Sequence, residues 1–145
     1  MKKCNFQKFK IFTLIFMSMN TLLSQELNDH KWNDRLLLII TNNVNNSNYK
    51  AQLKELNKHQ KGLSERKLVI YHILPTKFKK GLKGDNWTNS KKLHNSFKSS
   101  TSECEIVLIG LDGKWKLSTS QFLSCDKLFS TIDMMPMRQS ELKRN

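Results

Sequence analysis

The sequence lacks most of the features that assign a chain to a well-defined functional class. After the first 24 of its 145 residues, no apolar run approaches the roughly 20 residues that a membrane-spanning helix needs. No cysteine follows the first apolar stretch, so a lipoprotein anchor would have no attachment point. A Gly-x-Ser-x-Gly nucleophile motif and a phosphate-binding glycine loop are also absent. We therefore expect no membrane span after residue 24, and no reaction can be read from a motif.

Metal-binding and redox signatures are equally sparse. The four histidines are scattered without ligand-like spacing, so we predict no metal and no cofactor. Of the three cysteines, Cys4 lies near the start, which leaves Cys104 and Cys125 outside the first 24 residues. This pair is not in Cys-x-x-Cys spacing. It is compatible with one structural disulfide or with two unpaired thiols, and a catalytic redox pair is a third alternative.

The first 24 residues have the three parts of a secretory signal peptide. "MKKCNFQKFK" carries four lysines and no acid, "IFTLIFMSMNTLL" is a short apolar stretch, and Ser24 is a small residue before Gln25. The apolar stretch is too short to favour an uncleaved membrane anchor. We predict a signal peptide over residues 1–24, a single mature domain over residues 25–145, and export to the periplasm or the medium.

The chain is strongly basic, with a formal net charge of +13. Without the four lysines of the first 24 residues, 21 basic and 12 acidic residues remain, which gives +9. A positive field of that size favours anionic partners. An A+T-rich genome is the alternative explanation, because lysine and asparagine both have A-rich codons.

Hydrophobic patterning predicts one α/β domain. Residues 35–41 form an apolar run typical of a strand buried on both faces, residues 49–66 an amphipathic helix capped by Ser47 or Asn48, and residues 67–74 a second strand. Residues 75–87 read as a loop, and a short helix follows. A hairpin and a helix capped by Ser124 complete the chain. The order β-α-β-α-β-β-α predicts a four-stranded mixed sheet of thioredoxin-like type, with the first two strands parallel.

The hairpin has the clearest local signal. Two strand-like runs flank Asp112-Gly113, a dipeptide favoured in two-residue type I′ turns. That register places Leu108 opposite Leu117, and Gly110 opposite Trp115. It also places Cys104 opposite Gln121, four residues before Cys125.

Two motifs resemble a known family. "LIGLDGKWKL" (residues 108–117) and "FSTIDMMPMRQSE" (residues 129–141) resemble the two signatures of the domain of unknown function 4174 family, and "RLLLI", Gln52 and "LSERKLV" fall where that family has similar residues. The resemblance covers nearly the whole mature chain. It implies a thioredoxin-like or peroxiredoxin-like fold, with related domains in animal sushi-repeat and extracellular matrix proteins, but no reaction, cofactor or catalytic residue. The motif residues are Arg35, Gly110, Asp112, Gly113, Lys116, Asp133, Met135, Pro136, Met137 and Arg138.

We interpret these motif residues as structural first. Pro136 would fall inside the last helix, where it removes a hydrogen bond and disfavours helical geometry at Met135. The helix should therefore end or kink near Met134, with the Met-Pro-Met turn packed on the sheet. Arg138 is expected to reach an acidic partner or helix carbonyls.

The loop after the first strand is where a thioredoxin-like protein would hold a redox thiol at a helix N-terminus. Here it reads "TNNVNNSNYK", without cysteine. Asparagine and serine suit a turn and a helix cap but cannot exchange disulfides. The proline expected before the third strand is missing as well. We therefore expect a non-catalytic module that binds a partner, with a thiol–disulfide or peroxide-handling protein using Cys104 and Cys125 as the alternative.

The basic stretch from Lys77 to Lys98 supplies a candidate anion-binding surface. Phe78, Trp87 and Phe97 are interleaved with its lysines, and Asp85 is its single acid. Export favours an anionic cell-envelope partner over nucleic acid. A solvated loop and helix, with the aromatics covering the core, is the alternative. The candidate anion-binding lysines are Lys77, Lys79, Lys80, Lys83, Lys91 and Lys92, and Lys98 closes the stretch.

Overall fold

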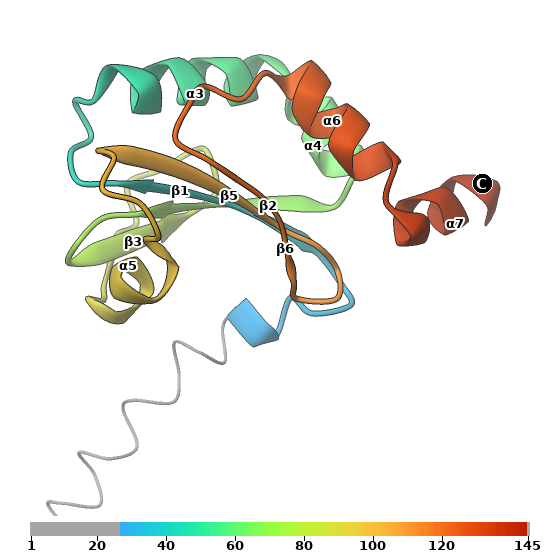
Figure 1. The fold of residues 1–145 in the computed structure, drawn as a ribbon, viewed down its shortest axis with the longest axis horizontal. Helices are drawn as coiled ribbons and strands as arrows, with labels where there is room; N and C mark the ends of the chain where they lie inside the picture. Colours follow the sequence, from blue (N-terminus) through green and yellow to red (C-terminus); the bar gives the residue numbers. More distant parts are fainter. Residues whose placement is uncertain (1–26, 145) are drawn as a thin grey trace, which may run out of the picture.

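The computed structural model describes residues 27–144, so the predicted signal peptide lies outside the described residues (Figure 1). None of the helices in this part of the chain has the length and apolar character that a bilayer crossing requires. The elements are β1 (Arg35–Thr41), α3 (Ser47–Lys58), α4 (Gln60–Glu65), β2 (Leu68–Ile73), β3 (Lys77–Lys80), β4 (Thr88–Asn89), α5 (Lys92–Phe97), β5 (Cys104–Ile109), β6 (Trp115–Thr119), α6 (Cys125–Asp133) and α7 (Pro136–Arg144).

The strands form one mixed sheet in the order β4-β3-β2-β1-β5-β6. The strands β1 and β2 are parallel, as expected for strands joined by helices, and every other neighbouring pair is antiparallel. The α/β class and the parallel first pair are confirmed. The prediction of four strands is wrong, because the sheet has six.

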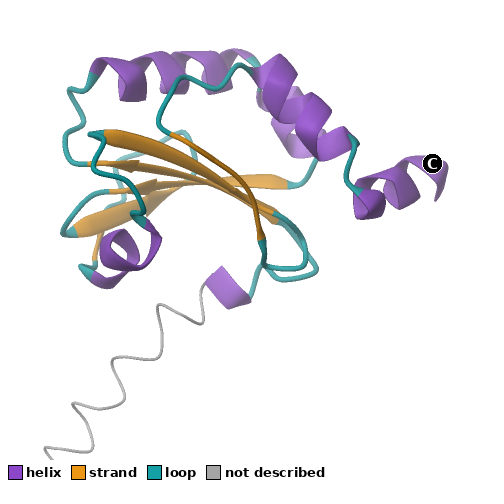
Figure 2. Ribbon diagram, in the orientation of Figure 1, coloured by secondary structure: helices purple, strands orange, loops and turns teal. Residues whose placement is uncertain are grey.

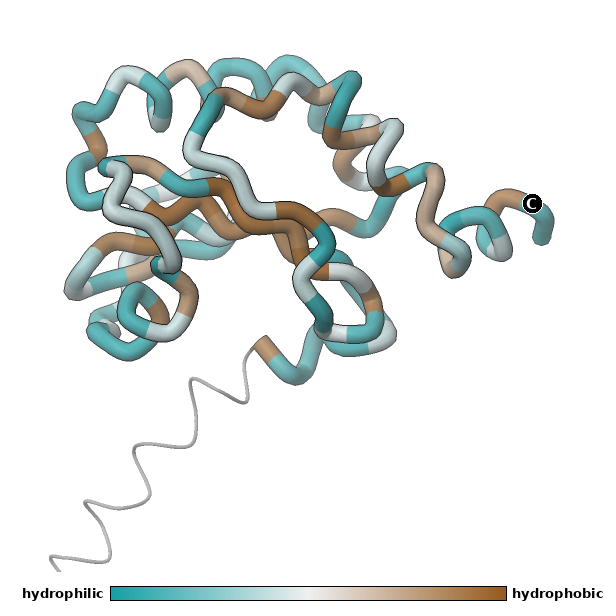
Figure 3. The backbone as a smooth tube through the Cα atoms, viewed as in Figure 1, coloured by the Kyte–Doolittle hydropathy of each residue, from teal (hydrophilic) through white to brown (hydrophobic). Residues whose placement is uncertain are grey.

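Helices cover the sheet on both faces. Figure 2 shows α3, α4 and α6 over one face and α5 on the other. All seven residues of β1 are buried: Leu37 and Ile39 face the larger helical layer, whereas Leu36 and Leu38 join the core beside α5. The hydrophobic residues accordingly concentrate in the central strands (Figure 3). The predicted burial of the first strand on both faces is confirmed.

The basic segment predicted as a loop contains the two extra strands. Phe78 pairs with Ile73 of β2 and is buried in the core beside α5. The ammonium groups of Lys77 and Lys79 lie 4.8 and 5.3 Å from the centre of the Trp87 ring. Lysine has a low strand propensity, so the sequence pattern did not predict β3. Cation–π contacts and one buried aromatic side chain offset that low propensity.

In the hairpin, the pairing of Trp115 and the type of turn both differ from the prediction. Leu108 lies opposite Leu117 as predicted, but a bulge shifts the pairing so that Trp115 faces Ile109 rather than Gly110. The amide of Gly113 donates to the carbonyl of Gly110, and the Gly110 amide donates to the Lys114 carbonyl. Among the residues of this loop, Gly113 alone has a positive φ, 74°. This is a three-residue loop with a glycine bulge, so the predicted type I′ turn is wrong.

The helices differ from expectation mainly at their ends. The predicted helix over residues 49–66 is two helices, because the chain leaves helical geometry at His59. Asn46 caps α3 by accepting a hydrogen bond from the Tyr49 amide, in place of the predicted Ser47 or Asn48. The predicted cap at Ser124 is confirmed.

The predicted break at Pro136 is confirmed as well. The helix α6 ends at Asp133, and Pro136 begins α7, at a position where its missing amide costs nothing. The turn between them packs less closely than expected, because Met134 is 73% exposed and only Met135 contacts the core. The helix α7 extends beyond the end of the sheet (Figure 1).

A buried histidine is locked in one tautomer beneath α3. His72 in β2 is fully buried, and its Nε2 lies 2.9 Å from the carbonyl oxygen of Gly81. A carbonyl only accepts, so Nε2 carries the proton, and Nδ1 accepts from the Tyr49 hydroxyl at 3.0 Å. Burial above all, and then the charge of Lys79, lower the pKa of His72 from 6.5 to about 4.

This pKa predicts a loss of stability at mildly acidic pH. The native pKa lies below that of the unfolded chain, so the stabilisation is complete above pH 6.5 and is lost as pH falls toward 4. The expected loss is about 3 kcal/mol of unfolding free energy, measured by urea denaturation between pH 7 and about 4. A His72→Gln variant should flatten this dependence, whereas His94→Gln should leave it intact; equal curves for wild type and His72→Gln would contradict the assignment.

Candidate functional site

The two family-like motifs meet at one end of the sheet. Arg35 begins β1 and Gly110 follows β5, and because β5 runs antiparallel to β1 these positions lie at the same end. Pro136 opens α7 beside them. Together they border a cleft of about 430 Å³. Its lining residues are Arg35, Gly110, Leu111, Asp112, Lys116, Thr131, Met134, Met135, Pro136 and Met137.

The hairpin side of the cleft is shaped by one lysine. The Lys116 ammonium donates to the Asp112 carboxylate at 2.8 Å, and its side chain crosses Gly110. A Cβ atom at Gly110 would lie 2.5 Å from Cε of Lys116, so a larger residue would displace it. The hydrogen bond from Lys116 lowers the pKa of Asp112. The spacing of the Gly-x-Asp-Gly-x-x-Lys motif is therefore explained by the turn and this ion pair.

A buried guanidinium lies behind the cleft. The side chain of Arg35 is only 1% exposed. Its Nη1 donates to the carbonyl oxygen of Arg66 at 2.9 Å, and its two terminal nitrogens face the carboxylate of Glu141 at 3.3 and 3.4 Å. This pairing joins the start of the central strand to the last helix, 106 residues later in the sequence.

Two further arginines complete the ion network. Arg66 donates to both carboxylate oxygens of Asp133, at 3.0 and 2.5 Å, and Arg138 donates to Asp133 at 3.3 Å and to Glu141 at 3.1 Å. Arg138 also donates to the carbonyl of Glu65, as expected for a residue that reaches helix carbonyls. The carboxylate of Glu65 also lies 3.9 Å from Nη1 of Arg66, so three guanidinium groups face three carboxylates.

The network keeps both carboxylates ionised. Burial alone would raise the pKa values of Asp133 and Glu141, but the arginine hydrogen bonds and charges outweigh it, so both pKa values lie below their ordinary values. Within the cleft itself, Asp112 and Lys116 neutralise each other. Among the described residues that line it, none is a paired nucleophile and base. The arrangement suits holding elements together and binding, rather than acid–base chemistry.

A family model described as Domain of unknown function (DUF4174) matches residues 26–141. The chain belongs to this family. The match spans all the residues of the cleft and the arginine network, so both are parts of the DUF4174 domain. No curated protein and no solved structure matches the chain.

At the opposite end of the sheet, the asparagine loop of this DUF4174 member is occupied by local hydrogen bonds. Asn43 accepts from the Asn45 amide, Asn46 caps α3 and also donates to Glu103, and Asn42 pairs with His94. The side chains therefore fix the turn and its neighbours, as the sequence predicted. The loop carries no thiol.

The two cysteines lie in the core between the sheet and the larger helical layer. Cys104 is 3% exposed and Cys125 is fully buried, and both are free thiols in the structure. Burial raises the pKa of Cys104. Burial, and then the charges of Glu55 and Asp126, raise the pKa of Cys125 to about 11. A disulfide between them remains a prediction.

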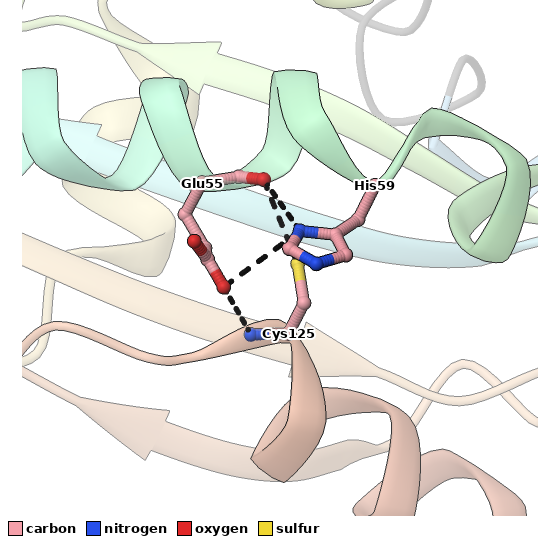
Figure 4. A group of neighbouring side chains, drawn as sticks. All are labelled: Glu55, His59 and Cys125. Atoms are coloured by element: carbon pink, nitrogen blue, oxygen red, sulfur yellow. Dashed lines mark hydrogen bonds and ion pairs between the residues drawn. The ribbon is translucent and has the colours of Figure 1, made fainter.

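The structure brings together one cluster that sequence spacing did not reveal. Glu55 of α3 and His59, the residue between α3 and α4, face Cys125 at the start of α6, and one ligand-type atom from each lies within 4.8 Å of the others (Figure 4). The signal in the sequence is only the i, i+4 spacing of Glu55 and His59, because Cys125 follows 66 residues after the histidine. Two members of the ion network, Arg66 and Glu141, were also not among the predicted site residues.

The six candidate anion-binding lysines have different environments. Lys79 is 9% exposed and donates to the Gly84 carbonyl, and Lys77 is partly buried against Trp87. The others have exposed side chains: Lys80, Lys83, Lys91 and Lys92. These four remain candidates for contact with an anionic partner.

The arginine network predicts a specific cost for one neutral substitution. Asp133→Asn leaves Arg66 and Arg138 without their shared carboxylate, and should lower the free energy of unfolding by about 2 kcal/mol, measured by urea denaturation at neutral pH. Asp112→Asn is the matched control, since the exposed pair with Lys116 contributes less than about 1 kcal/mol. Equal losses in the two variants would show that the network contributes no more than a surface ion pair.

Proposed function

We propose that this chain is an exported, non-catalytic thioredoxin-like module that binds a partner or a cell-envelope surface. The observation that carries the proposal is the burial of both thiols. Thiol exchange and peroxide reduction require an accessible thiolate. Cys104 and Cys125 have raised pKa values and side chains closed to solvent, so neither reaches that state at neutral pH.

The strand arrangement supports the thioredoxin-like part of the proposal. Four neighbouring strands run in the order β2-β1-β5-β6, with β1 parallel to β2 and both β5 and β6 in an antiparallel hairpin. The helices α3 and α4 cross from β1 to β2, and α6 follows the hairpin. On this reading, β3 and β4 are an extension at one edge, and the asparagine loop occupies the place of a redox centre.

Export is supported by the signal-peptide pattern of residues 1–24. Fractionation of cells that express the full chain tests it. The mature protein should appear in the periplasm or the medium, with an N-terminus close to Gln25.

The absence of redox turnover is the central prediction. Disulfide-reductase and peroxidase activities of the wild type should equal those of a Cys104→Ser, Cys125→Ser double variant, because neither thiol is reachable. Both activities are measured on the same preparations at neutral pH. Turnover clearly above the double variant would favour the alternative, a redox protein using these cysteines.

Retention on heparin tests whether the exposed lysines bind an anionic partner. Changing Lys80, Lys83 and Lys91 to Glu should shift elution from a heparin column to much lower salt, because exposed charge contacts are strongly screened. The matched control changes Lys50, Lys54 and Lys58, three exposed lysines of α3, to Glu with the same change in net charge. Equal shifts in both variants would mean that net charge alone, and not this surface, governs retention.

A further inference from the structure

We propose that Glu55, His59 and Cys125 form a binding site for Zn²⁺ between α3 and α6. The three residues supply a carboxylate, an imidazole and a thiolate, the ligand types that zinc prefers in proteins. Their ligand atoms already lie within 4.8 Å of one another (Figure 4). The inference is independent of the proposed partner-binding function.

The distances are close to those of a formed site. Zinc bonds of about 2.0–2.3 Å place neighbouring ligands of a tetrahedral site about 3.3–3.8 Å apart. The three groups therefore reach one ion after a small closure and a tilt of the imidazole ring. The backbone does not have to move far, because the carboxylate of Glu55 already accepts a hydrogen bond from the Cys125 amide at 3.1 Å.

The imidazole of His59 is oriented by a carbonyl of the preceding helix, α3. Nδ1 of His59 lies 2.9 Å from the carbonyl oxygen of Glu55, and since a carbonyl only accepts, Nδ1 carries the proton. Nε2 then retains a lone pair for the metal. Nδ1 is the nitrogen that lies 3.7 Å from Oε1 of Glu55, so the imidazole must tilt for Nε2 to share an ion with that carboxylate. Metal-bound histidines usually donate their second nitrogen to a carbonyl or carboxylate in this way. Phe129 packs edge-on against the ring, with 6.3 Å between centroids.

The thiol is held in place by a buried amide. Gln52, one helical turn before Glu55, is fully buried and both donates to and accepts from the backbone of Leu123, at 2.8 and 2.9 Å. These two hydrogen bonds fix the chain two residues before Cys125. A site with one fully buried ligand and supporting hydrogen bonds is better ordered than a chance surface cluster.

The local charge favours a cation. One carboxylate and one thiolate balance the charge of a divalent cation, and the ligand atoms of Glu55 and Cys125 lie within 4.8 Å of each other. On binding, the S–H bond of Cys125 breaks, its proton passes to water, and a sulfur–zinc bond forms without any change of oxidation state.

The chemistry also selects among metals. Ca²⁺ and Mg²⁺ prefer oxygen ligands and gain little from a thiolate. Three protein ligands leave a fourth position, and the side chain of His59 is 40% exposed, so water or a donor from outside has access. The ion would join the C-terminal end of α3 to the start of α6 within the same helical layer (Figure 1).

Cobalt provides a direct test, because Co²⁺ bound to a thiolate acquires a charge-transfer absorption. The full chain is expressed, purified under reducing conditions, freed of metal and titrated with Co²⁺ and then with Zn²⁺. We expect one equivalent of Co²⁺ to give the thiolate band and Zn²⁺ to abolish it. No thiolate band in the wild type would overturn the proposal.

Variants locate the site. His59→Gln and Glu55→Gln should weaken Zn²⁺ binding at least about tenfold in competition with a chromogenic chelator, since loss of even an outer partner costs that much. Cys125→Ser should remove the cobalt band, and Cys104→Ser, the other buried thiol, should retain it. Circular dichroism of each metal-free variant verifies folding, and His59→Gln, at a partly exposed position, keeps the test valid if a cysteine variant misfolds. Wild-type affinity in His59→Gln, or an unchanged band in Cys125→Ser, would place the metal elsewhere and refute the site.

Discussion

The buried guanidinium of Arg35 constrains much of the molecule. It occupies the first position of the central strand, where every side chain is buried, and a charge there is tolerated only with partners. Those partners are the carbonyl of Arg66, just after α4, and the carboxylate of Glu141 in α7, 31 and 106 residues further along the chain. The C-terminal helix must therefore return to the start of β1. One nitrogen of Arg35, Nε, still has no partner among the described residues, so the burial is not fully compensated.

This constraint explains why the family signatures lie so far apart in the sequence. The Met-Pro-Met-Arg segment breaks the last helix and turns Arg138 back toward Asp133 and Glu141. The hairpin motif forms the other wall of the same cleft. The two signatures thus describe one end of the sheet. The opposite end, where β1 finishes, is filled by asparagines that bond to their own neighbours.

Sequence patterns predicted the elements whose signals are local. The apolar run of β1, the Ser124 cap and the helix break at Pro136 all depend on residues within one or two turns of each other. The strand β3 was missed because its stability comes from Trp87, several residues further on, and from a single buried phenylalanine. The turn type was wrong because Asp112 keeps a negative φ and the glycine alone takes the left-handed conformation.

Candidate site residues were predictable only as members of motifs. Nothing in their spacing indicates that Arg35 would pair with Glu141, or that His59 would lie beside Cys125, because these pairs form only when the helices pack on the sheet. Sequence separation hides contacts of this kind. The chemistry of each side chain can be read from the sequence, but the residue that it contacts in the folded structure cannot.

The amide of Gln52 has a consequence of its own. By donating to and accepting from one residue, Leu123, it acts as a neighbouring strand would, in a place where the sheet has ended. A carboxylate of the same length could only accept, and a shorter amide would not reach. The link between α3 and the segment leading into α6 therefore depends on a side chain that both donates and accepts a hydrogen bond. Of the common side chains, glutamine is best suited to do this. This position should therefore vary less among related sequences than the leucines around it.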